Sequence, residues 1–244
     1  MKIWLWFLVP IGIAAADQAA VQQLFDSKLT AARRATACFE LRGDANPKVI
    51  NALGRAMEDP DLLSCAAGNL QRVGAIETLR QALSSHNFQV RAAAARELGR
   101  FEKPELLEAL SLAAQDENAL VAINALSGLS QYHDAVVTPY LTALARKGGM
   151  TGDMALDRLW QLDADMALQV ARGLLSSAQV PDRLYAMRII GASGNSSDLP
   201  QLRKIAATHR ETLSQHDRGF GFMPAINLAR AAQAAIASIQ LRLK

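Results

Sequence analysis

The sequence predicts an all-α protein, an α-solenoid of about six to seven stacked helix pairs. Half of the 244 residues are apolar but only 5% are aromatic, because alanine supplies much of the apolar content, and small side chains suit closely packed helices. Apolar residues recur three and four positions apart, and similar segments return after about thirty residues. No stretch shows the apolar and polar alternation of a β-strand.

The repeat is clearest when two segments are aligned. "QVRAAAARELGRFEKPELLEAL" begins at Gln89 and "LVAINALSGLSQYHDAVVTPYL" begins at Leu120, and five apolar positions match at an offset of 31. The last large apolar residues of the predicted first helices are 28, 31, 33 and 28 residues apart: Leu70, Leu98, Leu129, Leu162 and Ile190. A period of this length is typical of helix pairs that bury their apolar faces only against neighbouring pairs.

The predicted elements follow in order along the chain. A looser pair, near residues 21–42 and 47–57, precedes the clearest repeats at 58–208. Breakers such as Lys103-Pro104 lie within a pair, and others such as Gly148-Gly149 lie between pairs. An insertion at 208–224 and a final helix at 225–243 close the array, and this helix is expected to cap its end.

The first 16 residues have the plan of a secretory signal peptide. Lys2 precedes an apolar run of 14 residues that ends in Ala14-Ala15-Ala16, as signal peptidase requires. We expect cleavage after Ala16, a solenoid of residues 17–244, and export to a periplasm or secretion. An uncleaved anchor is the alternative, although a spanning helix needs about 20 apolar residues. No later segment is long enough to span a membrane.

Charge excludes one class of partner. The formal net charge is only +3 and the lysines and arginines are not clustered, so the basic patch that nucleic-acid binding requires is lacking.

Two cysteines lie almost one repeat apart. Cys38 and Cys65 are separated by 27 residues, beside a repeat step of 28, so they fall at similar positions on adjacent first helices. Axes of packed helices lie about 8–10 Å apart, within reach of a disulfide between inward-facing cysteines. A disulfide and a pair of buried thiols are both open, and either role is structural.

One segment carries a family resemblance. "SSHNFQVRAAAARELGRF" has Val90, Arg91, Ala94 and Leu98 in the positions typical of HEAT repeats, particularly the short repeats of bilin-lyase-related proteins. The resemblance extends over about residues 58–208. It implies an α-solenoid and a structural arginine at position 91 that pairs with an acid of the next unit.

Other units depart from that pattern. Position 122 is alanine in place of arginine, and Arg183 follows Asp182 in place of valine. The acid available to Arg91 is Asp116 or Glu117.

No catalytic constellation is evident. Deoxyhypusine hydroxylases, which share this fold, hold iron with His-Glu pairs, whereas none of the four histidines here is followed by glutamate. His209 and His216, with Asp217, would share a helix face and provide a metal-dependent or lyase-like alternative in the 209–217 region. A closed metal site usually needs three or four converging ligands, so solvent-exposed histidines are favoured. We therefore predict no catalytic residue, no metal and no cofactor.

The favoured function is an exported, non-enzymatic scaffold that binds another protein. In a solenoid the second helices line a concave surface. Acids there fall toward the amino-terminal units and bases toward the carboxy-terminal units, which favours a partner of opposite polarity. The candidate binding residues are Glu105, Glu108, Tyr140, Arg146, Arg172, Arg203 and Lys204, with Phe220 and Phe222 of the insertion. The two phenylalanines are expected to cover the end of the core, and a partner-binding lip is the alternative.

Overall fold

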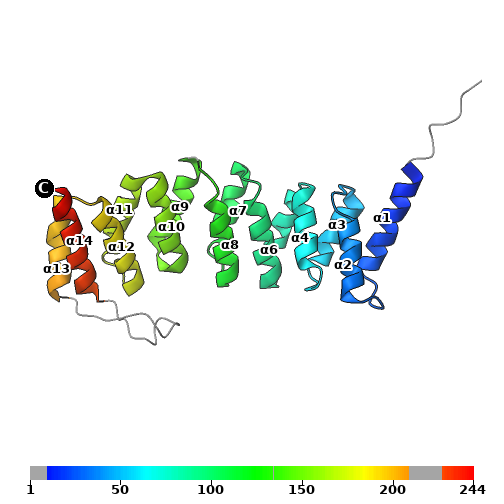
Figure 1. Ribbon diagram of the computed structural model, residues 1–244, viewed down its shortest axis with the longest axis horizontal. Helices are drawn as coiled ribbons and strands as arrows, with labels where there is room; N and C mark the ends of the chain where they lie inside the picture. The colour runs from blue at the N-terminus through cyan, green and yellow to red at the C-terminus, as the bar shows by residue number, and fades with distance from the viewer. Residues whose placement is uncertain (1–9, 134, 209–226) are drawn as a thin grey trace, which may run out of the picture. The chain divides into compact units, whose positions relative to one another are not determined.

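The computed structural model describes residues 10–133, 135–208 and 227–244, and the chain divides into two units, residues 1–131 and 132–244. Every regular element in these ranges is an α-helix or a 3₁₀ helix, and the helices follow one another in antiparallel pairs (Figure 1). The predicted all-α solenoid is therefore confirmed.

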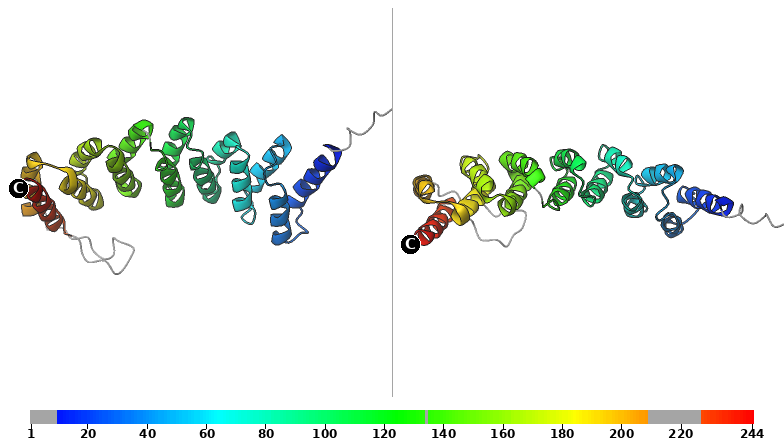
Figure 2. Two further views of the ribbon diagram at one scale, coloured as in Figure 1. Left: turned by 45° about the horizontal axis from the view of Figure 1, so that its top comes forward. Right: turned by 90° about the horizontal axis from the view of Figure 1, so that it is seen from above.

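The first unit consists of successive helices joined by short turns. Its elements are α1 (Pro10–Leu24), α2 (Ala31–Glu40), α3 (Pro47–Ala56), α4 (Leu63–Arg72), α5 (Ile76–Ala82), α6 (Phe88–Gly99), the 3₁₀ helix η1 (Pro104–Leu106), α7 (Leu107–Ala113) and α8 (Ala119–Leu129). The first helices of its pairs form one layer, in which α2 packs on α4, α4 on α6 and α6 on α8. The views in Figure 2 agree with this order.

The second unit repeats the arrangement. Its elements are η2 (Ala135–Val137), α9 (Thr138–Lys147), α10 (Gly149–Leu162), α11 (Ala164–Leu174), α12 (Val180–Ser193), η3 (Ser196–Asp198), α13 (Leu199–Thr208) and α14 (Leu228–Arg242). Here α10 packs on α12 and α12 on α14, while α9 packs on α11. Within this unit α9 also packs on α10, α10 on α11 and α13 on α14.

Asparagine side chains begin several of the helices. Asn46, Asn87, Asn118 and Asn227 each occupy the N-cap, where the side-chain oxygen accepts a hydrogen bond from the backbone N–H two residues later. These contacts satisfy donors that the first turn of a helix leaves unpaired. The final helix consequently begins at Leu228, three residues later than predicted.

The loosely predicted helix at 21–42 is wrong, because the structure contains two helices there. α1 ends at Leu24 and α2 begins at Ala31. Between them the Asp26 side chain accepts from the Lys28 N–H, and the Thr30 hydroxyl caps the N–H of Arg33. These side chains stabilise a turn that competes with a continuous helix.

The predicted cleavage position lies within α1. Ala20 and Leu24, which follow this position, are buried in the first unit. Cleavage after Ala16 would therefore retain these two core residues. None of the described helices combines the length and the apolarity needed to cross a bilayer.

A glycine contact sets the distance between α6 and α8. A Cβ added to Gly99 would lie 2.5 Å from the Cα of Gly128, and a Cβ on Gly128 would lie 2.8 Å from the Cα of Gly99. The two backbones touch at this crossing, and neither can move aside as a flexible side chain could.

Replacing Gly99 with alanine should lower the free energy of unfolding by about 1–3 kcal/mol, since the new methyl group forces the two backbones apart. The matched control is Gly68→Ala in α4, where an added Cβ meets no atom within 4 Å. That change should instead stabilise the protein by about 0.5–1 kcal/mol, because alanine favours helix. Urea unfolding measures both values. Equal changes of the same sign would contradict the proposed contact.

Candidate functional site

The candidate binding residues that the structure describes lie on one second helix and the 3₁₀ turn before it in the first unit, and on three second helices in the second unit. In the first unit, Glu105 lies in η1 and Glu108 in α7, and both are exposed. In the second unit, α9 carries half-buried Tyr140 and exposed Arg146, while α13 carries exposed Arg203 and Lys204. Phe220 and Phe222 lie outside the described residues. Their predicted role in covering the end of the core therefore stays a prediction.

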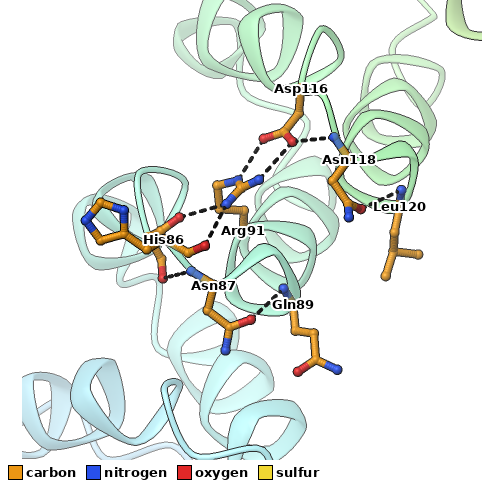
Figure 3. Close-up of polar contacts among 8 residues, drawn as sticks. His86, Asn87, Gln89, Arg91, Asp116, Asn118 and Leu120 are labelled. Atoms are coloured by element: carbon orange, nitrogen blue, oxygen red, sulfur yellow. Dashed lines mark hydrogen bonds and ion pairs between the residues drawn. The ribbon is translucent and has the colours of Figure 1, made fainter.

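Arg91 has the structural role implied by the resemblance. Its Nε donates to Asp116 Oδ2 at 2.7 Å, and its Nη2 donates to Asp116 Oδ1 at 2.9 Å (Figure 3). Nη1 donates to the backbone carbonyls of Ser85 and His86. The guanidinium thus joins the turn before its own helix to the turn before the next first helix, α8.

Electrostatics and backbone geometry reinforce this pair. The hydrogen bonds from Arg91 hold the pKa of the Asp116 carboxyl below its usual range, and Asp116 raises the pKa of Arg91. Asp116 Oδ1 also accepts from the Asn118 N–H at 2.8 Å. One carboxylate therefore pairs with the preceding unit and orders the turn that begins α8.

Two other arginines make equivalent connections. Arg34 in α2 pairs with Asp59 and Asp61, which precede α4. In the second unit Arg172 of α11 donates to both oxygens of Asp198, at 2.8 and 3.1 Å, in the turn that begins α13. Each arginine precedes its aspartate by 25 to 27 residues, close to one repeat.

The pair that contains Arg172 changes the composition of the candidate surface. Burial by itself would raise the pKa of the Asp198 carboxyl, but the hydrogen bonds from Arg172 and from the Asn195 N–H, together with the charge of Arg172, outweigh burial and lower this pKa. The Asp198 side chain is 6% exposed, whereas that of Arg172 is 37% exposed. Because Arg172 neutralises a buried acid, we assign it a structural role and retain Arg146, Arg203 and Lys204 as the basic candidates.

Cys38 and Cys65 form a disulfide in the structure, with their Cα atoms 6.3 Å apart. It joins α2 to α4. Beside it, the Asn69 side chain donates to the Cys38 carbonyl at 2.7 Å. The bridge and this hydrogen bond together tie the first helix pair to the second.

Sequence reasoning did not find a pair of buried acids in the second unit. Asp153 in α10 is 4% exposed, and Asp182 in α12 is 2% exposed. Burial raises the pKa of Asp153 to about 7, with a further increase from the negative charge of Asp182 and a decrease from Arg188. The one feature of the sequence that could have indicated this pair is Asp182, an acid at a position where the clearest repeat has valine.

Pockets occur in both units. One of about 350 Å³ in the second unit is lined by residues that include Arg146, Ser177 and Asp182. Another of about 410 Å³ in the first unit lies at the Gly99–Gly128 crossing, with Arg96 and Arg100 in its wall. Both arginines bond the buried carboxylate of Glu97.

The described ranges offer no cluster of three or more histidine, cysteine, aspartate or glutamate side chains that could hold a metal. His209, His216 and Asp217 lie outside those ranges. The His133 ring nitrogen Nδ1 lies 3.1 Å from Arg158 Nη2, which also donates to the Tyr132 carbonyl. His133, near the beginning of the second unit, thus contacts Arg158 of α10.

Stacked helix pairs linked by Arg–Asp contacts at one-repeat spacing define a helical-repeat protein. A family model of HEAT repeats matches residues 76–149, from the start of α5 to the start of α10. Residues 76–149 are HEAT repeats, which confirms the resemblance. No protein with curated function matches the sequence significantly.

Several solved structures are similar in fold. Human deoxyhypusine hydroxylase in complex with glycerol is 20% identical, with 96% of this chain and 100% of that chain covered and a TM-score of 0.41. YibA of Escherichia coli is 13% identical, with 97% and 99% covered and a TM-score of 0.48. The CpcE–CpcF complex of phycocyanin lyase from Nostoc is 18% identical, with 91% and 94% covered and a TM-score of 0.42. At these values the chemistry of those proteins is not transferred to this chain.

Proposed function

We propose that this protein is an exported, non-enzymatic HEAT-repeat scaffold that binds a protein partner through the exposed residues of its second helices. The observation that carries the proposal is that some arginines form ion pairs within the fold while others are exposed. Arg91 and Arg172 are bound to aspartates of neighbouring turns, whereas Arg146 and Arg203 are exposed on second helices of the second unit. Exposed charges of this kind steer association and select a partner of opposite charge.

The two units offer different surfaces to such partners. In the first unit the exposed face of α7 and η1 carries Glu105 and Glu108, with Leu112 exposed beside them at 66%. In the second unit the exposed charges of α9 and α13 are basic. An apolar side chain among charges is typical of an interface in which a few residues supply affinity and the charges supply specificity. An acidic partner surface fits the second unit.

Reversing the charges at Arg146 and Arg203 tests the assignment. Wild-type protein produced in its own cell envelope is used to capture and identify the bound protein, and the affinity of that purified partner is then measured. The Arg146→Glu/Arg203→Glu variant should bind at least about tenfold more weakly, since each new charge repels an acidic surface. Mature protein recovered from the envelope should begin at Asp17.

The control variant makes the same change in net charge elsewhere. Arg72→Glu/Arg230→Glu reverses exposed arginines on α4 and α14, which are not second helices. Its affinity should equal that of the wild type. Equal weakening in both variants would show a general charge effect and would contradict a binding face on the second helices.

A further inference from the structure

The buried acids of the second unit occupy places where an apolar residue is expected. Asp182 lies three positions after the N-cap of α12, where α6 has Val90 and α8 has Val121, both buried. A carboxylate is costly to bury unless hydrogen bonds or opposite charges compensate for lost water. The contacts of Asp182 therefore show what compensates for burying a carboxylate at a position where the other repeats have valine.

Asp182 fastens the turn between α9 and α10 to the start of α12. Its Oδ1 accepts from the Gly149 N–H at 2.8 Å, and its Oδ2 accepts from the Ser177 hydroxyl at 2.7 Å. Gly148 has a positive φ of 72°, and any Cβ there would collide with the Asp182 carboxylate. Glycine at position 148 thus permits both the turn and the close approach of Asp182.

Asp153 brings a second carboxyl group to the same contact. It lies four residues after Gly149, one turn along the same face of α10. Its Oδ1 is buried and has no hydrogen-bond partner in the part of the chain that the structure describes. Asp182, a second buried acid on the neighbouring helix α12, acts on Asp153 through its negative charge.

The charged groups on each packed helix define this environment. From α12, Arg188 acts on Asp153 but also pairs with Asp157, one turn further along α10. The remaining charges at this end of α9 and α11 are Arg146 and Lys147, which line the adjoining pocket, and Arg172, which is bound to Asp198. On α12 itself, Arg183 is the residue that follows Asp182.

We propose that a proton on the buried Asp153 carboxyl closes a proton-sensitive clamp, in which Asp182 holds the α9–α10 turn against the start of α12. With Asp153 protonated, Asp182 keeps its hydrogen bonds from Gly149 and Ser177. Loss of that proton places two negative charges in a buried site, and the contact opens to admit water. Arg146, at the end of α9, precedes this turn. Opening of the clamp would also alter partner binding through Arg146. That regulatory effect rests on the proposed function, whereas the clamp itself does not.

The direction of the pH dependence follows from the raised pKa. In the unfolded chain Asp153 has its ordinary value of 3.8, and burial raises it to about 7 in the folded protein. A raised carboxyl pKa stabilises the closed form fully below the ordinary value, and this stabilisation is lost as the pH rises through the folded value. The clamp should therefore be closed at pH 5.5 and largely open at pH 8.

Hydrogen exchange of the Gly149 amide reports the clamp directly, because this N–H donates to Asp182. After correction for the intrinsic effect of pH, protection in the wild type should fall at least about tenfold between pH 5.5 and 8. In Asp153→Asn, which keeps the shape but cannot ionise, protection should not depend on pH. The control Asp165→Asn, which removes an exposed acid of α11, should behave as the wild type.

A second measurement keeps the test independent of folding. Carboxyl-carbon NMR of the intact protein should show Asp153 titrating near neutral pH, whereas titration below pH 5 would overturn the proposal. Persistent pH dependence in Asp153→Asn, or flat protection in the wild type, would also overturn it. Neither experiment requires a partner, so a failed partner-binding test leaves both results interpretable.

Discussion

Reduction of the Cys38–Cys65 disulfide should lower the free energy of unfolding by about 3–4 kcal/mol. The bridge spans 27 residues and restricts the unfolded chain, and closing loops of this length contributes about that amount. It also joins the first helix pair to α4 and its neighbours, so its loss should loosen α2 first. Urea unfolding with and without dithiothreitol measures the change.

The variant Cys38→Ala/Cys65→Ala separates the bridge from other effects of the reductant. Without dithiothreitol it should show the lowered stability of the reduced wild type, because alanine fills much of the space of a buried thiol. Addition of dithiothreitol should then change nothing. A wild type whose unfolding is insensitive to complete reduction, verified by thiol counting, would show that the bridge does not stabilise the fold.

Replacing Arg91 with methionine should lower the free energy of unfolding by about 2–3 kcal/mol. Methionine keeps most of the apolar stem but leaves Asp116 without its charged partner, in a site where both side chains are 14% exposed. An uncompensated, mostly buried carboxylate is costly, and two backbone carbonyls also lose their donor. Urea unfolding at pH 7 measures the loss.

The double variant Arg91→Met/Asp116→Asn is the matched control. Asparagine retains an oxygen for the Asn118 N–H but carries no charge, so this variant should recover much of the lost stability. A double variant no more stable than Arg91→Met would contradict the assignment of the loss to the uncompensated charge of Asp116, and would point to the lost hydrogen bonds to the Ser85 and His86 carbonyls.

The Arg91–Asp116 pair also has a defined pH dependence. The pKa of Asp116 is lowered in the folded protein, so the contribution of the pair is present above the ordinary value of 3.8. It is lost as the pH falls through the folded value. The stability difference between wild type and Arg91→Met should therefore shrink in acid, which is opposite in sign to the effect expected for Asp153.

The repeat register explains which parts of the site were predictable. The family resemblance implied a structural Arg91 paired with Asp116 or Glu117, of which the structure has Asp116, and the repeat spacing placed the two cysteines on adjacent first helices. The ion pair of Arg172 was not predicted. Its position on a second helix indicated a surface role, whereas the structure pairs it with Asp198 in the turn that begins α13, 26 residues later.

The buried acids were beyond prediction from spacing. Asp182 was recognised as a departure from valine, but burial of Asp153 depends on how α10 turns toward α12. That orientation is set by the Gly148–Gly149 turn and its hydrogen bond to Asp182, which join residues more than thirty positions apart. The spacing of apolar residues along a helix predicts which face of the helix is buried, but it does not predict the angle at which two helices pack.

The sequence by itself determined the helical class and the period of the repeat, because both follow from spacing along one helix or from one repeat to the next, and the family resemblance implied the structural role of Arg91. The tertiary structure decided how closely the helices approach, as at Gly99 and Gly128, and which acids lose contact with water. Those properties depend on side chains from separate helices that occupy the same small volume, so they arise only when the pairs stack.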